Sequence, residues 1–367
     1  MAARTKRQVV VAGASGFVGH AAARQFAASG WDVIGLSRNK PFADIPGATF
    51  LPIDLRDADA CRTLAASLPD ATHLVYAAVN ETPGDLVASW SDPRHAERNG
   101  AMFANLLDAL IDHAPGLEQV TVVHGTKAYG PHVPGWHIPV PLKESHARPP
   151  IDDFYFRQED HLRARASKTL RWTVFRCPSI AGGGPGGNLN AFLAIGVFAA
   201  IRRAEGLNLP FPGAADNHGI MEVIDVDLLA RAIEWAAMAP TACNATFNIA
   251  NGDVYAWPDM WPHLARIFGI TPAGHDPMSV RAYIQNRGAI WADIVRQHRL
   301  RASEDVMAFL GESGALADFL LGNCQRTMLT STVRLRQAGF TDCMDTEERM
   351  AYWIGRWREQ GLLPPAG

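Results

Sequence analysis

The chain has 367 residues, of which 48% are hydrophobic, and its formal net charge is −3. A chain of this length buries a large core, as one large domain or as two closely joined ones. The charge and the lack of basic runs give no support for nucleic-acid binding, and no stretch reaches the roughly 18 apolar residues that span a membrane.

The N-terminus and the cysteines indicate the compartment. Met1 to Arg7 lead into an apolar strand without the pattern of a signal peptide, so we expect a cytoplasmic protein. The five cysteines are scattered, odd in number and without a CxxC pair, which favours reduced thiols over disulfides or a zinc site. The histidines are not spaced as metal ligands either, and we predict no metal.

A glycine turn stands between an apolar strand at 9–12 and a small-residue helix, with glycines in GxxGxxG spacing. The first glycine allows a tight turn, the second lets backbone approach a pyrophosphate, and the third lets the helix lie close to the strand. The helix N-terminus adds free N–H groups and a positive dipole end. A tight turn without a ligand is the alternative. We predict a dinucleotide site contacted by Gly13, Ser15, Gly16, Phe17, Val18 and Gly19.

The residues after the second strand indicate which dinucleotide binds. This strand runs into Ser37, Arg38 and Asn39, and no Asp or Glu stands there to hold a ribose 2′-hydroxyl, as in NAD-binding units. Arg38 and Ser37 suit a 2′-phosphate, and Lys40 adds positive charge. An ordinary solvated arginine is the alternative. We predict NADP(H) rather than NAD(H), with Ser37, Arg38 and Asn39 at the cofactor.

Strands and helices alternate through the first 250 residues. Strand-like runs lie at 49–53, 73–77, 119–124, 172–176 and 247–250, and helical patterns at 99–113 and 156–168. This alternation predicts an α/β fold, a Rossmann doubly wound parallel sheet with helices on both faces.

Two pairs of residues follow predicted strands at their carboxyl ends, where ligands bind in open α/β sheets. Asp54 and Leu55 follow the third strand, and Ala77 and Ala78 follow the fourth. Asp54 suits the adenine amino group, and the small alanines let a cofactor pass close. As an equally open alternative, Asp54 caps the helix that starts near Ala58.

The pattern changes after Arg176. The segment 182–187 is rich in Gly and Pro and does not match a P-loop, so we expect a mobile loop over the nicotinamide end of the cleft. We assign residues 1–180 to the dinucleotide-binding domain, to which strands and helices near 220–250 return. Residues 181–220 and 251–367 form a smaller, mainly helical substrate-binding region and lid. We expect its Trp, Met and Phe residues to be mostly helix core, and some to line an apolar substrate cavity.

Lysine and tyrosine decide the catalytic hypothesis. Short-chain dehydrogenases use a tyrosine hydroxyl and a nearby lysine, usually as YxxxK on one helix face. None of the six tyrosines here has a lysine four residues later. However, Lys127 directly follows the apolar strand 120–124, and Tyr155 falls at or near a helix start 28 residues later. The two could therefore meet in one cleft; otherwise Tyr155 is a half-buried aromatic.

The segments around these residues resemble a known family. GTKAY and DFYFRQED are similar to the GTKxY and NFYYxQED motifs of the progesterone 5β-reductase/iridoid synthase (PRISE) family of short-chain dehydrogenases/reductases. The resemblance covers nearly the whole chain. Its further segments are GASGFVGH, Asp54-Leu55, Arg176-Cys177-Pro178, LPFPG at 209–213 and FNIANGDV at 247–254.

The resemblance implies that Lys127 and Tyr155 are the catalytic pair. It also implies that NADPH is the cofactor, and we add Thr126, Pro178 and Ile180, with the catalytic pair, to its contacts. The family reduces activated C=C bonds of enones or enals, and some carbonyls.

Four departures from the family stand close to these motifs. The Asn before the family's FYY is Asp153 here and its second Tyr is Phe156, so Tyr155 is taken as the functional tyrosine. The TG before the lysine has become His124-Gly125, and the family's second basic residue after the second strand is Asn39.

The mechanism that we predict is conjugate reduction. Hydride from NADPH reaches the β-carbon, Tyr155 stabilises the enolate oxygen, and Lys127 tunes Tyr155 and orients the nicotinamide ribose. Carbonyl reduction by the same pair stays open, because both reactions develop charge on one oxygen. The expected substrate is a small hydrophobic enone, enal or carbonyl compound, with no nucleic-acid or membrane partner and with a homodimer as one open oligomeric state.

Two other function classes remain as alternatives. A sugar-nucleotide epimerase or dehydratase would need YxxxK, which is absent, and basic groups for a diphosphate, for which Arg202 and Arg203 are candidates. A non-catalytic NADPH-sensing protein would be expected to have lost the Lys/Tyr pair, which is present here.

Overall fold

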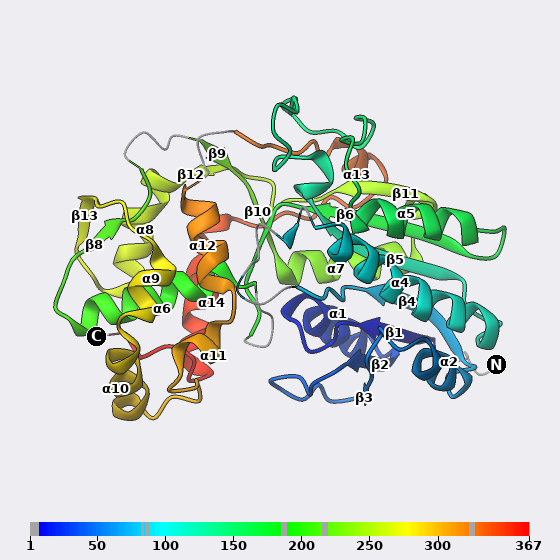
Figure 1. Cartoon of the computed structure of the whole chain (residues 1–367), viewed down its shortest axis with the longest axis horizontal. Coiled ribbons are helices and arrows are strands. Elements are labelled where there is room, and N and C mark those ends of the chain that lie inside the picture. Colours follow the sequence, from blue (N-terminus) through cyan, green and yellow to red (C-terminus); the bar gives the residue numbers. More distant parts are fainter. Residues whose placement is uncertain are drawn as a thin grey trace. The chain divides into compact units, whose positions relative to one another are not determined.

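The computed structural model describes residues 7–81, 84, 89–90, 92–184, 189–214, 219–322 and 327–366 (Figure 1). The chain divides into two compact units. Unit 1 comprises Met1–Pro178, Val226–Ile249 and Thr330–Asp342, and unit 2 comprises Ser179–Asp225, Ala250–Leu329 and Cys343–Gly367. The segment 330–342 thus lies in unit 1, although the sequence analysis placed it in the substrate-binding region.

Unit 1 contains a parallel sheet, in which the described residues form seven strands in the order β11-β6-β5-β4-β1-β2-β3. The strands are β1 Gln8–Ala12, β2 Asp32–Ser37, β3 Ala48–Pro52, β4 Ala71–Tyr76, β5 Gln119–Gly125, β6 Arg171–Cys177 and β11 Ala245–Asn248. The strand order reverses at β1, which pairs with both β2 and β4. Ligands bind at such a switch point in doubly wound sheets, and the predicted fold class is confirmed.

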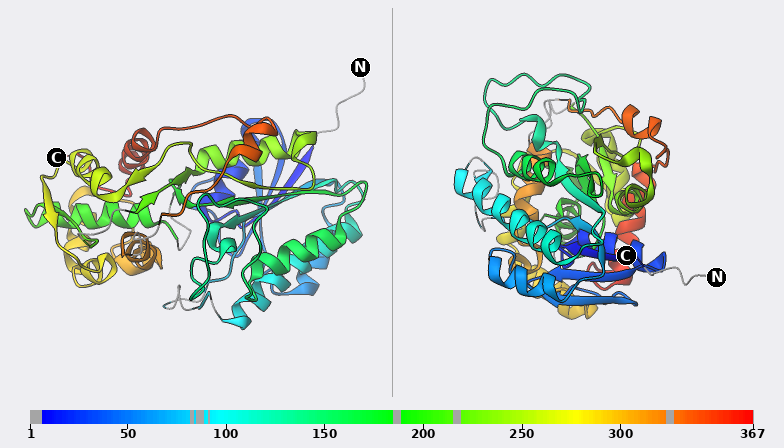
Figure 2. Two further views of the ribbon diagram at one scale, coloured as in Figure 1. Left: turned by 90° about the horizontal axis from the view of Figure 1, so that it is seen from above. Right: turned by 90° about the vertical axis from the view of Figure 1, so that its right-hand side faces the viewer.

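Helices cover both faces of this sheet (Figures 1 and 2). α1 (Phe17–Ala28) packs with α7 (Val226–Met238) on one face, whereas α2 (Ala58–Ala66), α4 (Pro93–His113) and α5 (Phe154–Arg165) lie on the other. The short helix α13 (Val333–Gln337) packs against β11.

The buried strands explain this layered arrangement. Val9, Val10 and Val11 of β1 are fully buried, and continuous apolar strands of this kind belong to parallel sheets with both faces covered. On the α4 face, Phe103 and Leu106 join Val10 in one hydrophobic core. The sheet that carries the predicted cofactor site is therefore buried between two layers of helices.

Unit 2 is mainly helical in its described part. Its helices are α6 Ala191–Ala204, α8 Trp257–Phe268, α9 Val280–Gln285, α10 Gly288–His298, α11 Val306–Leu310, α12 Ser313–Gly322 and α14 Thr346–Glu359. Its short strands are β7 Ser179–Ala181, β8 Leu209–Phe211, β9 Ile220–Met221, β10 Val223–Asp225, β12 Tyr255–Ala256 and β13 Pro272–His275. The expectation of an aromatic helix core holds for Trp257, Trp261 and Trp291, which are all buried.

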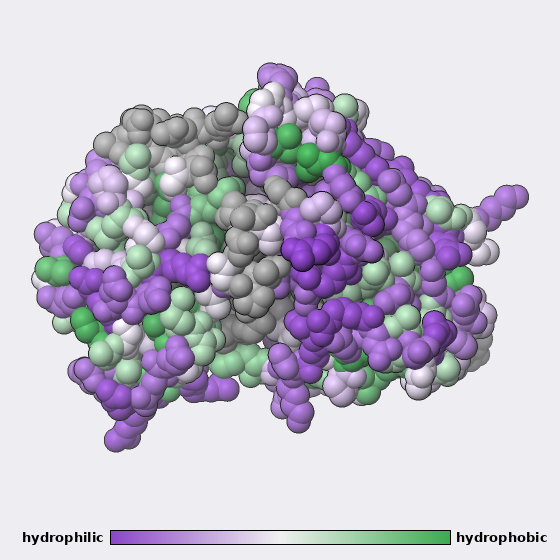
Figure 3. Space-filling model, viewed as in Figure 1, coloured by the Kyte–Doolittle hydropathy of each residue, from purple (hydrophilic) through white to green (hydrophobic). Residues whose placement is uncertain are grey.

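The surface is largely polar on the face that Figure 3 shows. Among the described residues, no helix is both long enough and apolar enough to cross a membrane. Part of the predicted loop at 182–187 lies outside the described residues.

Candidate active site

The glycine turn joins β1 to α1, and its glycines have different surroundings. Gly13 has a φ of 86°, and a Cβ there would lie 2.7 Å from the Ala77 carbonyl oxygen and 2.9 Å from the Ala78 nitrogen. A Cβ at Gly19 would lie 2.2 Å from the Gly13 oxygen. A Cβ at Gly16 would meet the Gly13 oxygen at 3.3 Å and nothing else within 4 Å. Backbone thus closes on Gly13 and Gly19, whereas at Gly16 the Gly13 oxygen is the single close neighbour of a Cβ, at a distance shorter than an ordinary contact.

The start of α1 supports the same interpretation. The helix begins at Phe17, its N-cap Gly16 has no side chain to cap it, and its first turn holds no acidic residue. The first helical hydrogen bond runs from the His20 N–H to the Gly16 oxygen. The N–H groups of Phe17, Val18 and Gly19 precede that bond and have no helical partner, which is the arrangement that binds phosphates. Ser15 lies half-buried in the same turn.

The residues after β2 stand at the surface. The Ser37 hydroxyl donates to the Asn39 carbonyl at 2.7 Å, while Arg38 and Asn39 are exposed. Arg38 acts electrostatically on Asp54, which follows the neighbouring strand β3. The predicted NADP(H) determinants and the predicted adenine contact are therefore close to each other.

Asp54 does not cap α2, and that alternative of the sequence analysis is wrong. The N-cap is Asp57, whose side chain accepts from the Ala60 N–H. Asp54 instead accepts from the backbone and guanidinium of Arg56, and these hydrogen bonds lower the pKa of its carboxyl to about 2. Leu55 is buried beside it.

Lys127 and Tyr155 come together from two elements. Lys127 lies in a short 3₁₀-helix (η1, Thr126–Tyr129) at the carboxyl end of β5, and Tyr155 lies in the first turn of α5. The Lys127 Nζ is 5.1 Å from the centroid of the Tyr155 ring and 4.6 Å from that of Phe154. The Tyr155 hydroxyl reaches Gly125, where a Cβ would lie 3.1 Å from it.

Asp153 connects the two residues. One carboxylate oxygen accepts from the Tyr155 N–H at 2.9 Å and so caps α5, and the other lies 2.9 Å from the Lys127 Nζ. The side chains of Asp153 and Lys127 are 1% and 10% exposed. The family's Asn at this position would cap the helix equally well. Asp153 differs from it by a negative charge, and this charge forms the ion pair with Lys127. The substitution is plain in the sequence, but the ion pair that follows from it was not predicted.

The environment of Tyr155 keeps its hydroxyl protonated. Burial raises the pKa of Tyr155 far above its ordinary value, and the nearby Asp153 carboxylate raises it further, whereas a backbone hydrogen bond with Gly125 lowers it. At neutral pH the hydroxyl is therefore a hydrogen-bond donor.

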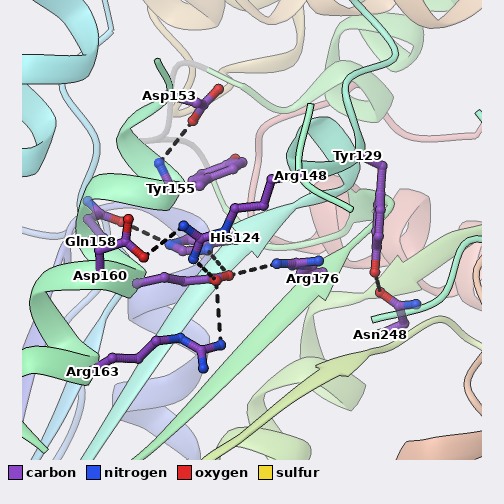
Figure 4. A network of polar contacts seen from close by, with 11 residues as sticks. His124, Tyr129, Arg148, Asp153, Tyr155, Gln158, Asp160, Arg163, Arg176 and Asn248 are labelled. Carbon is purple, nitrogen blue, oxygen red and sulfur yellow. Dashed lines mark hydrogen bonds and ion pairs between the residues drawn. The ribbon is translucent and has the colours of Figure 1, made fainter. Parts of the chain in front are cut away.

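His124 fixes the plane of the tyrosine ring. Its imidazole stacks on the Tyr155 ring with centroids 4.2 Å apart, and its Nε2 is 3.0 Å from the Gln158 Oε1 (Figure 4). No role for His124 was predicted from the sequence. Its only signal was the departure from TG before the lysine.

A buried ionic cluster continues behind His124. Glu159 Oε1 is 3.7 Å from the His124 Nδ1 and accepts from Arg176 at 2.9 Å, and Glu159 Oε2 accepts from Arg148 at 2.9 Å. Burial alone would raise the pKa of Glu159, but the neighbouring His124 imidazole and the Arg176 charge hold it well below its ordinary value. Glu159 is therefore ionised.

Tyr129, the other tyrosine of this region, has a different partner. Its hydroxyl donates to the Asn248 side chain at 2.5 Å, and the Arg176 guanidinium lies 5.0 Å from its ring centroid (Figure 4). The Tyr129 hydroxyl is thus bound to a buried amide, whereas Lys127 and Asp153 both contact Tyr155.

The remaining predicted residues have the following places. Thr126 starts η1, and Pro178 follows β6 at the end of the first segment of unit 1. Ile180 lies in β7 of unit 2, where it pairs with Ile224. Within the described residues, no group of His, Cys, Asp or Glu is arranged to hold a metal.

The arginines that the epimerase alternative would need have other partners. In unit 2, Arg202 donates to the Asn208 carbonyl and Arg203 to the Pro365 carbonyl. Guanidiniums occupied by backbone carbonyls are less suited to a diphosphate.

The sheet order, the glycine turn and the Lys/Tyr pair at the carboxyl edge define a Rossmann-fold oxidoreductase of the short-chain dehydrogenase/reductase class. Residues 72–348 match the model of the PRISE-like Rossmann-fold domain. The chain belongs to this family.

Two relatives illustrate the family. The 3-oxo-Delta(4,5)-steroid 5-beta-reductase of Arabidopsis thaliana is 31% identical, over 97% of this chain and 92% of its own. An (S)-8-oxocitronellyl enol synthase of Antirrhinum majus is 29% identical, over 91% of this chain and 86% of its own. The predicted family and the predicted oxidoreductase class are confirmed.

Solved structures share the fold. A UDP-glucose 4-epimerase of Thermotoga maritima superposes with a TM-score of 0.65 at 18% identity, covering 96% of this chain and 99% of its own. At this identity the likeness supports the fold alone.

Proposed function

We propose that the protein reduces activated C=C bonds of enones or enals with NADPH. One observation carries this proposal: at the carboxyl end of β5 the Lys127 ammonium lies 5.1 Å from the centroid of the Tyr155 ring, without a YxxxK motif. The relatives named above, a steroid 5-beta-reductase and an enol synthase, favour this chemistry.

The residues at the glycine turn fit a dinucleotide. The side-chain-free backbone at Gly16 and the uncapped start of α1 suit a pyrophosphate, and the exposed Arg38 suits a 2′-phosphate. The backbone of Ala77 and Ala78 packs directly against Gly13, so this part of the site is bordered by backbone atoms rather than by side chains. When bound, NADPH supplies the hydride.

Tyr155 supplies the electrostatic stabilisation. Its hydroxyl donates a hydrogen bond to the substrate carbonyl oxygen, on which negative charge grows as the β-carbon is reduced. The stacked His124 ring and the helix cap Asp153 hold the phenol in one orientation, so little reorganisation is needed during the reaction.

Lys127 adds a positive charge on the same side. Its ammonium lies over the Tyr155 ring and pairs with Asp153, which keeps it in place. This charge favours movement of the Tyr155 proton toward the substrate oxygen. The same pair would also serve carbonyl reduction, since the charge develops on one oxygen in both reactions.

The class of substrate is inferred from two features that a sugar-nucleotide enzyme would need. Without YxxxK, and with Arg202 and Arg203 engaged by carbonyls, a sugar nucleotide is a poor candidate. The presence of both Lys127 and Tyr155 speaks against a non-catalytic sensor. We therefore favour a small, hydrophobic enone or enal with few charges.

A pair of conservative variants tests the assignment of the tyrosine. Tyr155→Phe keeps the ring that stacks on His124 and removes the donor, so it should lower kcat by about 10²-fold or more, the scale for losing one oxyanion donor. Its affinity for NADPH should stay unchanged. Tyr129→Phe is the matched control and should keep most of the turnover. If Tyr129→Phe loses activity and Tyr155→Phe does not, the wrong tyrosine has been assigned.

A further inference from the structure

A pocket rich in arginine lies within unit 1, apart from the glycine turn. Its volume is about 400 Å³, which is in the range of small-molecule sites. Neither Lys127 nor Tyr155 borders it, so it is not the predicted substrate cleft. Its lining residues are Glu144, His146, Arg148, Glu159, Arg163, Trp172, Arg176, Asn244, Thr246 and Arg334.

The two carboxylates of the pocket are already engaged. Glu159 accepts from Arg148 and Arg176, each at 2.9 Å. Glu144 accepts from the Asn248 backbone N–H at 2.8 Å. Arg148 and Arg176 are thus paired with Glu159, and Arg148 also with Asp160, so the excess positive charge of the lining rests on Arg163 and Arg334.

Two of the arginines are only weakly paired. Arg163 lies 3.8 Å from Glu159, beyond hydrogen-bond distance, and its guanidinium packs over the Trp172 ring at 4.5 Å. Arg334 stacks over Phe247 at 5.6 Å and forms no ion pair within the described residues. Both side chains are in contact with solvent, so their N–H groups are available to a ligand.

Two buried polar atoms in the same pocket have no hydrogen-bond partner. They are the Arg176 Nε and the Thr246 Oγ1, and both residues are 5% exposed. Buried donors without a partner are rare in folded proteins because leaving one unsatisfied is unfavourable. Both atoms are themselves shielded from solvent, so they add to the polarity of the pocket wall rather than contact a ligand directly.

We propose that this pocket binds a small oxyanion, a molecule that bears a phosphate or carboxylate group. Guanidinium groups present paired N–H donors that match such groups. Figure 4 shows Arg148, Arg163 and Arg176 approaching from different elements, so the fold itself brings the charges together. The bound oxyanion lies between the accessible guanidiniums of Arg163 and Arg334.

Calorimetric titration of the full chain tests the site with two probes, sodium phosphate and sodium succinate. Each is titrated at constant ionic strength against a sodium chloride blank. We expect saturable binding of at least one probe to the wild-type protein. Phosphate alone would indicate a phosphate-bearing ligand, and succinate a dicarboxylate; either result supports the site.

Variants identify where the probe binds. Arg163→Gln and Arg334→Gln change solvent-exposed side chains and should fold, which circular dichroism verifies, and each should weaken binding by at least fivefold. Arg336→Gln is the matched control, because Arg336 is exposed on the same helix α13 but does not line the pocket. The proposal is overturned if neither probe saturates, or if binding survives in both pocket variants, since the anion would then be elsewhere, for example at the glycine turn.

Discussion

The close packing around the glycine turn can be tested with a matched pair of alanine substitutions. Gly13 and Gly47 have nearly the same φ, 86° and 85°. A Cβ at Gly47 would meet nothing within 4 Å, whereas at Gly13 it would lie 2.7 Å from the Ala77 oxygen. The two variants therefore share the cost of a left-handed backbone and differ in the clash.

The magnitudes follow from these two terms. A left-handed conformation costs an L-residue about 1–2 kcal/mol, which is the whole effect expected for Gly47→Ala. Overpacking adds about 1–3 kcal/mol, so Gly13→Ala should lower the free energy of unfolding by about 2–5 kcal/mol. The backbone of Ala77 cannot rotate away as a side chain would. Hence the difference between the variants measures how closely the segment after β4 approaches the turn.

Urea unfolding followed by circular dichroism gives the two free energies, and fluorescence titration gives the cofactor affinity. Gly47→Ala should bind NADPH as the wild type does, while Gly13→Ala should bind it more weakly. Equal destabilisation by both substitutions would refute the packing argument, because the clash at Ala77 would then cost nothing.

Three further predictions concern the cofactor, the turn and the buried cluster. NADPH should bind at least about tenfold tighter than NADH, and Arg38→Ala should remove that preference, since an arginine–phosphate pair contributes about 1.5–3 kcal/mol; equal titration curves before the substitution would contradict it. Gly16→Ala, whose Cβ would lie 3.3 Å from the Gly13 oxygen, should lose less stability than Gly13→Ala and about tenfold or more of its NADPH affinity; an unchanged affinity would speak against a pyrophosphate there. Because the pKa of Glu159 is depressed in the fold, its stabilising contribution is present above its ordinary pKa of 4.5 and is lost as the pH falls toward the folded value. Glu159→Gln should therefore be less stable than the wild type at pH 7, and its free energy of unfolding should fall less as the pH is lowered. Parallel curves of unfolding free energy against pH for the two proteins would count against an ionised Glu159.

Much of the site could be predicted because its signals are local. The glycine spacing identified the turn, and the position of Lys127 after an apolar strand placed it at the carboxyl edge of the sheet. Tyr155 was expected at a helix start, and Asp153 provides the cap that starts this helix. The family resemblance linked these segments, which no spacing rule joins.

Other features depend on contacts that the local sequence does not encode. The segment 330–342 joins unit 1 through the Ser331 N–H, which donates to the Leu142 carbonyl at 2.7 Å, and nothing near Ser331 indicates that partner. The stacking of His124 on Tyr155 likewise requires β5 and α5 to be placed first. Asp54 and Asp57 are equivalent cap candidates by type, and only the start of α2 at Ala58 decides between them.

The most direct test of the proposed reaction follows the position of the transferred hydrogen. The wild-type protein and Tyr155→Phe are each incubated with a small cyclic enone and NADPH that carries deuterium at the nicotinamide C4, and the products are analysed by NMR. The wild type should give the saturated ketone with deuterium at the β-carbon, and Tyr155→Phe should give the same product much more slowly. Deuterium on the carbinol carbon of an allylic alcohol, or transfer that does not depend on the Tyr155 hydroxyl, would contradict conjugate reduction at this site.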